Sequence, residues 1–210
     1  MIRMRSGIAV LAALLWTLPA AAVTLPDQVV KQTTDKLSKE IQHRSAEFKA
    51  KPRVFYAVVD DLIVPKFDQR YIAQLVLGRN WRDASESQRA RFTEAFKNQL
   101  IRTYADALLE YNDQVRADWQ PLRMAPGATD AVVKSTLIRK DAPPVSIGFS
   151  LRLKDDGWKI YDISVENISL ISSFRGQAVS EIKDSGIDGL IQKLEAGQFL
   201  KKSKKKKGDE

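Results

Sequence analysis

The first half of the chain carries apolar side chains at the 3.6-residue spacing that is typical of amphipathic helices. One such stretch begins after Pro26, and a second begins near Pro52 and is ended by Pro65. A third is expected to run from Asp68, which suits an N-cap, to Gly78, which suits the left-handed residue that follows many helices. These signals predict three helices in the first 78 residues.

A longer helix is predicted next. It opens on Ser85-Glu86-Ser87-Gln88, which has the form of a capping box. Its broad apolar face holds Phe92, Ala95, Phe96, Leu100, Tyr104, Ala107 and Leu108. The helical part of the chain therefore covers about residues 26–112.

From Gln114 the period changes to the strict alternation of a half-buried strand. Asp155-Asp156-Gly157 is a tight-turn signal, and Trp158 to Val165 is predicted as the returning strand of a hairpin. Two further strands are expected over 114–119 and 132–139, with residues 140–144 as a connection. The clearest alternation places Val145, Ile147, Phe149, Leu151 and Leu153 on one face. An antiparallel sheet of about four strands is thus predicted over about 114–166.

Two helices are predicted to close the fold over about residues 170–197. Their apolar positions are Phe174, Ala178 and Ile182 on the first, and Ile187, Leu190, Ile191 and Leu194 on the second. The order of helices, antiparallel sheet and helices predicts an α+β fold in a single domain over 23–200. A chain of that length can bury a sizeable core.

The two ends of the chain differ from this domain. Arg3 and Arg5 precede the apolar run 8–18, and Ala20-Ala21-Ala22 follows it, so residues 1–22 are predicted to be a secretory signal peptide. The apolar run is about eleven residues, shorter than the ~20 that cross a bilayer. Residues 201–210 hold six lysines and two acids and are predicted to be disordered, either as a solubilising tail or as one that steers the protein toward anionic surfaces.

The composition argues against several classes of function. The net charge of +8 lies mostly in the two ends, and the body from Val23 to Leu200 keeps only +2, which argues against a nucleic-acid binder. The chain has no cysteine, so disulfides, thiol catalysis and thiolate metal sites are excluded.

Catalytic candidates are few. His43 is the single histidine and lies on a highly charged helix. The pairs Asp60-Asp61 and Asp155-Asp156 are expected at a helix end and in a turn, where they would be solvated. Phosphate-binding glycine loops and the HExxH and GxSxG motifs are missing from the sequence.

Aromatic residues cluster on the long helix, the hairpin and the helix–sheet junctions. They are Trp81, Tyr104, Tyr111, Trp158, Tyr161 and Phe174. Such residues fill an ordinary core, but a curved sheet capped by helices can also enclose an apolar cavity of the kind that binds small molecules. Periodicity leaves both alternatives open.

Five separated segments of the sequence are informative together, namely residues 77–81, 102–105, 157–163, 166–175 and 186–190. They resemble the MlaC family of periplasmic phospholipid-binding proteins, which belong to the lipid-asymmetry or toluene-tolerance transport system. The resemblance spans about residues 27–195. Three departures are Asn167 in place of a common glycine, and Ser173 and Phe174 in place of asparagine and tyrosine. The Lys-rich tail is not a shared feature.

This resemblance implies a periplasmic carrier without enzymatic activity that encloses phospholipid tails in an apolar cavity, with the lipid as cargo and no cofactor or metal. It also implies two partners, an outer-membrane lipoprotein complex and an inner-membrane ATP-driven lipid transporter. The alternatives are a periplasmic adaptor that binds protein alone, and an exported enzyme that uses Asp or Tyr as its acid-base group. The expected lining residues are Val76, Leu77, Leu100, Tyr104, Ile147, Phe149, Leu151, Trp158, Tyr161, Ile163, Leu170 and Phe174.

Overall fold

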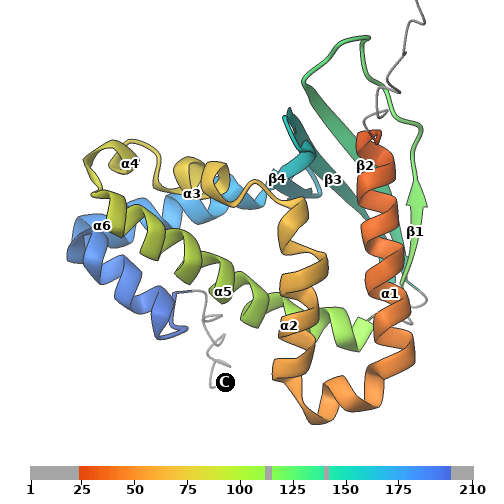
Figure 1. Cartoon of the computed structure of the whole chain (residues 1–210), viewed down its shortest axis with the longest axis horizontal. Helices are drawn as coiled ribbons and strands as arrows, with labels where there is room; N and C mark the ends of the chain where they lie inside the picture. The colour runs from red at the N-terminus through yellow and green to blue at the C-terminus, as the bar shows by residue number, and fades with distance from the viewer. Residues whose placement is uncertain (1–23, 112–114, 140–141, 200–210) are drawn as a thin grey trace, which may run out of the picture.

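The computed structural model describes residues 24–111, 115–139 and 142–199. The predicted signal peptide and the Lys-rich tail lie outside the described residues. Helices lie at both ends of this part of the chain and a sheet lies between them, which confirms the α+β prediction (Figure 1). The elements are α1 (Pro26–Ala50), α2 (Pro52–Leu62), the 3-10 turn η1 (Val64–Lys66), α3 (Gln69–Leu77), α4 (Asn80–Asp83), α5 (Glu86–Tyr111), β1 (Val115–Trp119), β2 (Asp130–Arg139), β3 (Ala142–Lys154), β4 (Gly157–Val165), β5 (Ile168–Ser169) and α6 (Leu170–Glu195).

Local capping signals fix where the helices begin. The Asp68 carboxylate accepts a hydrogen bond from the Tyr71 amide at 3.2 Å, so Asp68 is the predicted N-cap of α3. The capping box of α5 is formed in both directions. The Ser85 amide donates to the Gln88 side chain at 2.9 Å, and the Gln88 amide donates to the Ser85 hydroxyl at 3.2 Å.

Gly78 follows α3, but its conformation differs from the prediction. Its φ of 56° is positive as expected, whereas its ψ of −124° lies outside the left-handed helical region. The chain turns directly into α4 here, where the Trp81 amide donates to the Gly78 carbonyl at 3.2 Å. The glycine therefore serves a tight connection between two helices.

The sheet has five antiparallel strands in the order β1-β2-β3-β4-β5, one more than the approximate four predicted. The additional strand, β5, has only two residues, too few to show an alternating pattern. β3 also begins at Ala142, although residues 140–144 were expected to form a connection. Pro143 and Pro144 can belong to β3 because β4 pairs with it only from Ile147 onward, so the prolines have a neighbouring strand on one side alone.

A β-bulge changes the side-chain alternation of β4. Ser150 pairs with Asp162, but the next residue of β3, Leu151, pairs with Ile160, so Tyr161 is the extra residue. As a result Trp158 and Ile160, at even-numbered positions, share one face of the sheet with Ile163 and Val165, at odd-numbered positions.

α6 is interrupted at Gly186, whose φ of 71° and ψ of 176° are not helical. The two predicted closing helices correspond to the two halves of α6 on either side of this glycine. Both halves contribute buried residues to the same core, including Phe174 before the break and Leu190 after it.

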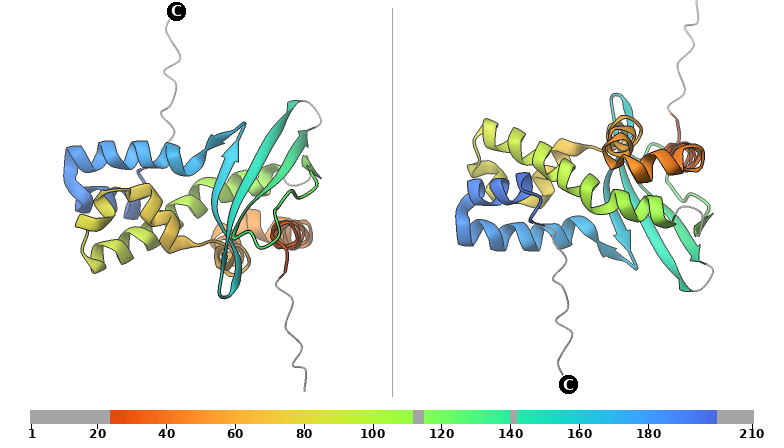
Figure 2. Two further views of the ribbon diagram at one scale, coloured as in Figure 1. Left: turned by 90° about the horizontal axis from the view of Figure 1, so that it is seen from above. Right: turned by 90° about the horizontal axis from the view of Figure 1, so that it is seen from below.

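Three apolar clusters hold the fold together. The first, called the helical cluster, joins α3, α4, the N-terminal half of α5 and both halves of α6. The second, called the α1–α2 cluster, adds the C-terminal half of α5 to α1 and α2. The third, called the sheet cluster, packs Val30 of α1 against Val133, Leu151, Trp158 and Ile160. Figure 2 shows the helices α3 to α6 on one side and the sheet with α1 on the other.

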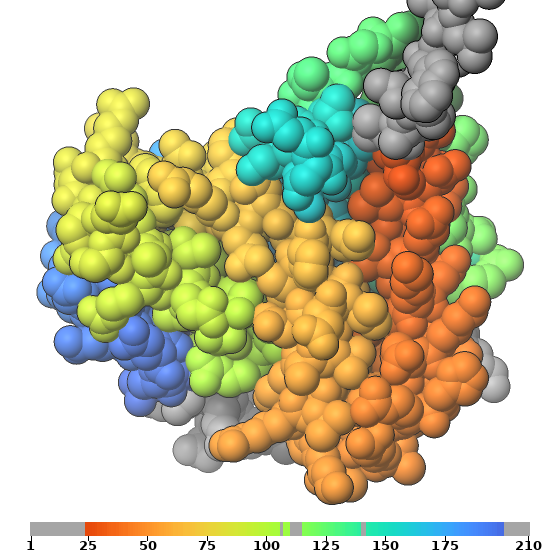
Figure 3. All heavy atoms as spheres, in the orientation of Figure 1, coloured from red at the N-terminus to blue at the C-terminus, as the bar shows by residue number. Residues whose placement is uncertain are grey.

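The β3–β4 hairpin is attached to the segment between α2 and α3. The Asp68 amide donates to the Ile160 carbonyl at 2.9 Å, and the Lys159 ammonium donates to the Pro65 carbonyl at 2.9 Å. In the space-filling view the hairpin tip lies between α1 and α3 (Figure 3). These bonds join the sheet to the helical side of the molecule.

Candidate functional site

One face of the sheet is apolar from edge to edge. The strand register places Trp119, Ser135 and Ile147 side by side on it, with Phe149 opposite Val133 and Ile163. Near α1 this face is covered by the sheet cluster, in which Leu151 is 0% exposed. Toward the other end of the strands, Val145, Ile163 and Val165 are only half-buried. The apolar face is therefore filled at one end and less covered at the other.

A stripe on α5 has the same character. Leu100 packs against the helical cluster, whereas Ala105 and Leu109 belong to the α1–α2 cluster and Ile101 packs against it. At about 100° per residue, Tyr104 and Leu108 fall between these two faces of the helix. Tyr104 is 41% exposed and Leu108 is 42% exposed, which are large fractions for an aromatic and an apolar residue. The C-terminal half of α5 runs toward β1 and lies beside the sheet (Figures 1 and 2).

The start of α6 frames this region. The ring of Phe174 meets that of Phe96 edge-on, with centroids 5.4 Å apart, and Leu170 packs against the same helical cluster as Leu100. Just before it, Ile168 of β5 is 64% exposed. The N-terminal end of α6 thus adds apolar surface next to the half-buried end of the sheet.

Electrostatic features near this region are weak. Burial raises the pKa of the Tyr104 hydroxyl. No group of His, Asp or Glu side chains suited to a metal ion is found among the described residues. The described helices also include none that is long and apolar enough to span a bilayer.

Two surface hollows also occur, but both lie away from the apolar face. One of about 380 Å³ is formed between the two halves of α6 and includes Glu181 and Lys193. Another, of about 450 Å³, lies between α5 and the end of α6 and includes Arg91 and Glu195. The lining of the first hollow is mostly polar, and neither hollow contains a residue of the predicted lining set.

Comparison with known families assigns the fold. Residues 31–196 match the family model described as MlaC protein. The chain belongs to the MlaC family.

Relatives in this family support the same assignment over most of their length. The intermembrane phospholipid transport system binding protein MlaC of Haemophilus influenzae is 27% identical over 188 residues, which cover 89% of this chain and 88% of the relative. The toluene tolerance protein ttg2D of Pseudomonas putida is 29% identical over 187 residues, which cover 88% of this chain and 85% of that protein.

A solved structure is similar as well. It is the phospholipid-binding protein of Ralstonia solanacearum, determined in complex with a phospholipid, and it matches with a TM-score of 0.76 and 30% sequence identity. The match covers 85% of this chain and 100% of that one.

The departures from the MlaC pattern have local explanations. Asn167 has a φ of 63°, a conformation that glycine adopts freely and that asparagine tolerates better than most residues. Phe174 is 5% exposed and contacts the ring of Phe96, so its site in the helical cluster is apolar and does not require a tyrosine hydroxyl.

The predicted lining residues divide into three groups. Phe149, Leu151, Trp158 and Ile163 belong to or contact the sheet cluster. Ile147 and Tyr104 lie outside the three clusters, on the apolar face and on the α5 stripe. The remaining six belong to or contact the helical cluster: Val76, Leu77, Leu100, Tyr161, Leu170 and Phe174.

Tyr161 lies apart from the apolar face because it is the bulged residue. Its ring packs edge-on against that of Tyr71 of α3, with centroids 5.4 Å apart. Burial, followed by the charge of Asp130, raises the pKa of Tyr161, and a hydrogen bond with the Ser150 side chain opposes this rise. Ser150 alternates with Leu151 and so points to the opposite face of β3.

Three residues of this region were missed from the sequence. Trp119 and Leu108 are absent from the predicted lining set although both are large and apolar, because a short strand and a broad helical face do not show which side is covered. Ser135 was missed because it is polar. It is 1% exposed on the apolar face, and its hydroxyl oxygen has no hydrogen-bond partner.

Proposed function

We propose that this protein is a periplasmic phospholipid carrier, and that it holds acyl tails between the apolar face of the sheet and the α5 stripe. The observation that carries the proposal is the exposed apolar stripe of Tyr104 and Leu108 beside the half-buried end of the sheet. The Ralstonia protein, solved with a phospholipid, supports it, because the match covers 85% of this chain and 100% of that one.

Hydrocarbon burial supplies the energetics of such a carrier. A diacyl phospholipid has on the order of 30 methylenes, and exposing them to water costs on the order of 20 kcal/mol. A protein that encloses most of this surface makes transfer from a bilayer nearly balanced in free energy, so the lipid can also be unloaded. The described apolar residues would supply the enclosure, and no covalent step is required.

We further propose that the carrier works between two membranes. The predicted signal peptide supports export, and the Haemophilus relative is a binding protein of an intermembrane phospholipid transport system. The two partners expected are an outer-membrane lipoprotein complex and an inner-membrane ATP-driven lipid transporter. Bound phospholipid would be the cargo, and the protein itself would not act as an enzyme.

The enzymatic alternative would need a buried carboxylate that faces the apolar region. Asp68 is the carboxylate among the described buried residues, and it caps α3 and pairs with Lys154 at 3.2 Å. Its two interactions are structural, so this residue gives no support to acid-base catalysis at the apolar face.

Lipid mass spectrometry tests the proposal. The full-length protein is purified from cells without detergent, extracted, and analysed for phospholipid. A delipidated sample is then incubated with phospholipid vesicles and re-isolated. We expect phospholipid in both samples. A protein that is empty after purification and stays empty after incubation would refute the carrier function and favour the protein-binding adaptor.

A further inference from the structure

Five arginines surround the short helix α4, at the end of α5 opposite to Tyr104. Arg70 comes from α3, Arg79 and Arg82 from α4 and its N-cap, Arg89 from α5, and Arg175 from α6. We call these five residues the arginine patch. Arg79 and the last residue of α3 belong to one of the segments shared with the MlaC family, and Arg175 belongs to another.

Trp81 holds two of these side chains. The guanidinium carbons of Arg70 and Arg89 lie 5.9 and 5.3 Å from the centre of its ring, which is a cation–π arrangement. Arg89 also donates to the Trp81 carbonyl at 2.8 Å and to the Arg82 carbonyl at 3.2 Å. These contacts fix the positions of charged groups that would otherwise move freely.

Arg175 is held by a different device. A Cβ atom on Gly78 would lie 2.9 Å from both Nε and Nη2 of Arg175, so the guanidinium lies directly on the glycine backbone. Gly78 also has a positive φ of 56°, which favours glycine at this position. This close approach places the Arg175 guanidinium of α6 next to α4.

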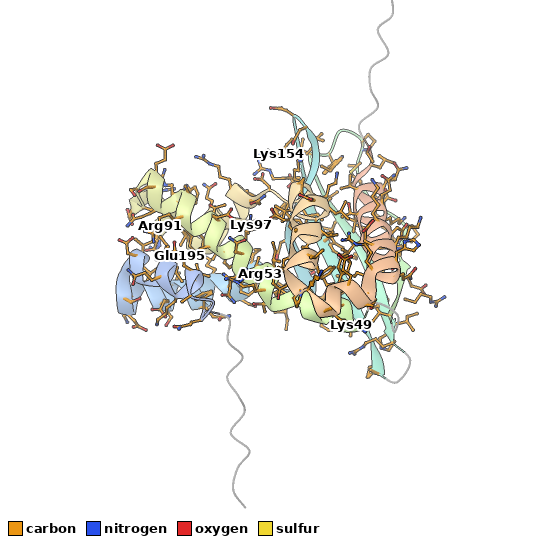
Figure 4. All side chains as sticks on the ribbon, turned by 60° about the horizontal axis from the view of Figure 1, so that its bottom comes forward. Lys49, Arg53, Arg91, Lys97, Lys154 and Glu195 are labelled. Atoms are coloured by element: carbon orange, nitrogen blue, oxygen red, sulfur yellow. The ribbon has the colours of Figure 1, made fainter. Side chains whose placement is uncertain are left out.

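None of the five arginines forms an ion pair within the part of the chain that the structure describes. The acids of the same segment, Asp83 and Glu86, form none there either. Some other surface arginines do form ion pairs, as Arg91 does with Glu195 at 3.0 Å, and the two side chains point toward one another in Figure 4. Gathering like charges adds repulsion to a fold, and no ion pair with a described residue offsets it at the patch.

We propose that the arginine patch is a docking surface for a protein partner that presents clustered carboxylates. Guanidinium groups match carboxylates in bidentate geometry, and fixing them beforehand lowers the entropic cost of binding. A membrane is the less suited partner because exposed large apolar residues are sparse here. Val179, one turn from Arg175 on α6, is an exposed large apolar residue of the described chain.

The position of the patch also fits docking. Arg89 and Tyr104 are fifteen residues apart on α5, about 22 Å along the helix axis. A partner bound to the patch would therefore leave the α5 stripe uncovered. The proposal does not rest on lipid carriage, since none of the five arginines belongs to the apolar region described above.

A matched pair of charge reversals tests the proposal in the full-length protein. Arg79→Glu with Arg82→Glu changes the patch at two exposed positions, and the Trp81 contacts of Arg70 and Arg89 are kept. The control, Lys49→Glu with Arg53→Glu, makes the same change in net charge at exposed residues of the α1–α2 corner (Figure 4). Both proteins keep the same Lys-rich tail.

The probes are a synthetic polyglutamate peptide and vesicles of phosphatidylcholine containing phosphatidylglycerol. We expect the patch variant to lose about tenfold in affinity for the peptide, and the control to change by no more than about twofold. Equal losses of peptide affinity in the two variants would show that the effect comes from net charge alone, and would overturn the proposal. Vesicle binding that exceeds peptide binding and disappears in the patch variant would overturn it in favour of a membrane.

Two controls separate this result from folding and from lipid carriage. Circular dichroism should show the same helix content in both variants. The phospholipid content of the patch variant should equal that of the unaltered protein. A patch variant that folds but loses its lipid would overturn the assignment of these arginines to docking, whereas a lipid-free unaltered protein would refute only the carrier function.

Discussion

The rings of Trp119 and Phe149 lie 6.1 Å apart at an interplanar angle of 36°, although their strands are separated by β2. Ser135 of β2 pairs with Trp119, so its side chain lies on the face that these rings share. Its hydroxyl oxygen is buried without a partner. Replacement by alanine removes an unsatisfied polar group at almost constant volume.

We expect Ser135→Ala to raise the free energy of unfolding by about 1 kcal/mol, because an unpaired buried hydroxyl costs roughly that much or more. Urea denaturation measures the change. The control is Ser164→Ala, since the Ser164 hydroxyl donates to the Gly148 carbonyl at 3.4 Å and its loss should not stabilise the protein. A lower stability of Ser135→Ala would show that the hydroxyl has a favourable role in the fold.

Leu108→Arg should remove bound phospholipid and leave the fold intact. Leu108 is 42% exposed, so the new side chain can reach water in the empty protein, but a charge placed among acyl tails costs several kcal/mol. Lipid mass spectrometry and circular dichroism together measure the effect. Leu151 is a poorer choice for this test, because it is 0% exposed and arginine there is expected to unfold the sheet cluster.

The matched control for Leu108→Arg is Val132→Arg. Val132 is 47% exposed on β2 and pairs with Ser150, on the face opposite to Leu151. This variant should keep its phospholipid. Equal lipid content in the two arginine variants would exclude the α5 stripe from the tail-binding region.

Gly78→Ala should destabilise the protein by about 1–3 kcal/mol, because alanine is strained at a φ of 56° and its Cβ would press on Arg175. Adding Arg175→Ala removes the second cause and keeps the first. The double variant should therefore lose less stability than the sum of the two single variants, as measured by thermal or urea unfolding. Strict additivity would indicate that the two residues do not contact one another in solution.

The acid response of α6 is also predictable. Hydrogen bonds from Lys193 and then Ser185 lower the pKa of Glu181 below its ordinary value of about 4.5. A carboxyl group with a lowered folded pKa contributes stability above the unfolded value, and this contribution is lost as the pH falls through the folded value. Acidification in that window should weaken the contact between the two halves of α6.

Nuclear magnetic resonance titration of Glu181 checks this cause. Lys193→Gln should move the titration midpoint upward, because it removes the first and largest of the lowering interactions. Lys183→Gln is the control, since Lys183 is exposed on α6 and forms no ion pair with another described residue. An unchanged midpoint in Lys193→Gln would contradict the ion pair.

Features that depend on neighbours in sequence were predictable. The Asp68 cap and the Ser85 capping box follow from residues within one helical turn, and the alternation from Val145 to Leu153 is that of a strand with one buried face. Features that depend on pairing between strands were not. The two-residue β5 is too short to have a periodic pattern, and the shift from even to odd apolar positions in β4 does not show that Tyr161 is the extra residue, because a bulge is defined by pairing with the partner strand.

The lining set shows the same limit. Alternation identified Phe149 and Leu151 as residues of one face, and the register places them on the apolar face. It could not separate the filled end of that face from the half-buried end, which depends on where α1 packs. Val76 and Leu77 have helical periodicity suited to any interior, and the structure buries both within the helical cluster.

The extra residue Tyr161 reverses the alternation of inward and outward side chains for every later residue of β4. Upstream of it the even-numbered residues Trp158 and Ile160 are turned toward α1, and downstream the odd-numbered Ile163 and Val165 share their face. Deletion of this residue would exchange the two faces of one half of the strand, so that the polar side chains of that half would point into the core. Homologous chains should therefore accept changes of residue type along this strand far more readily than any change in its length.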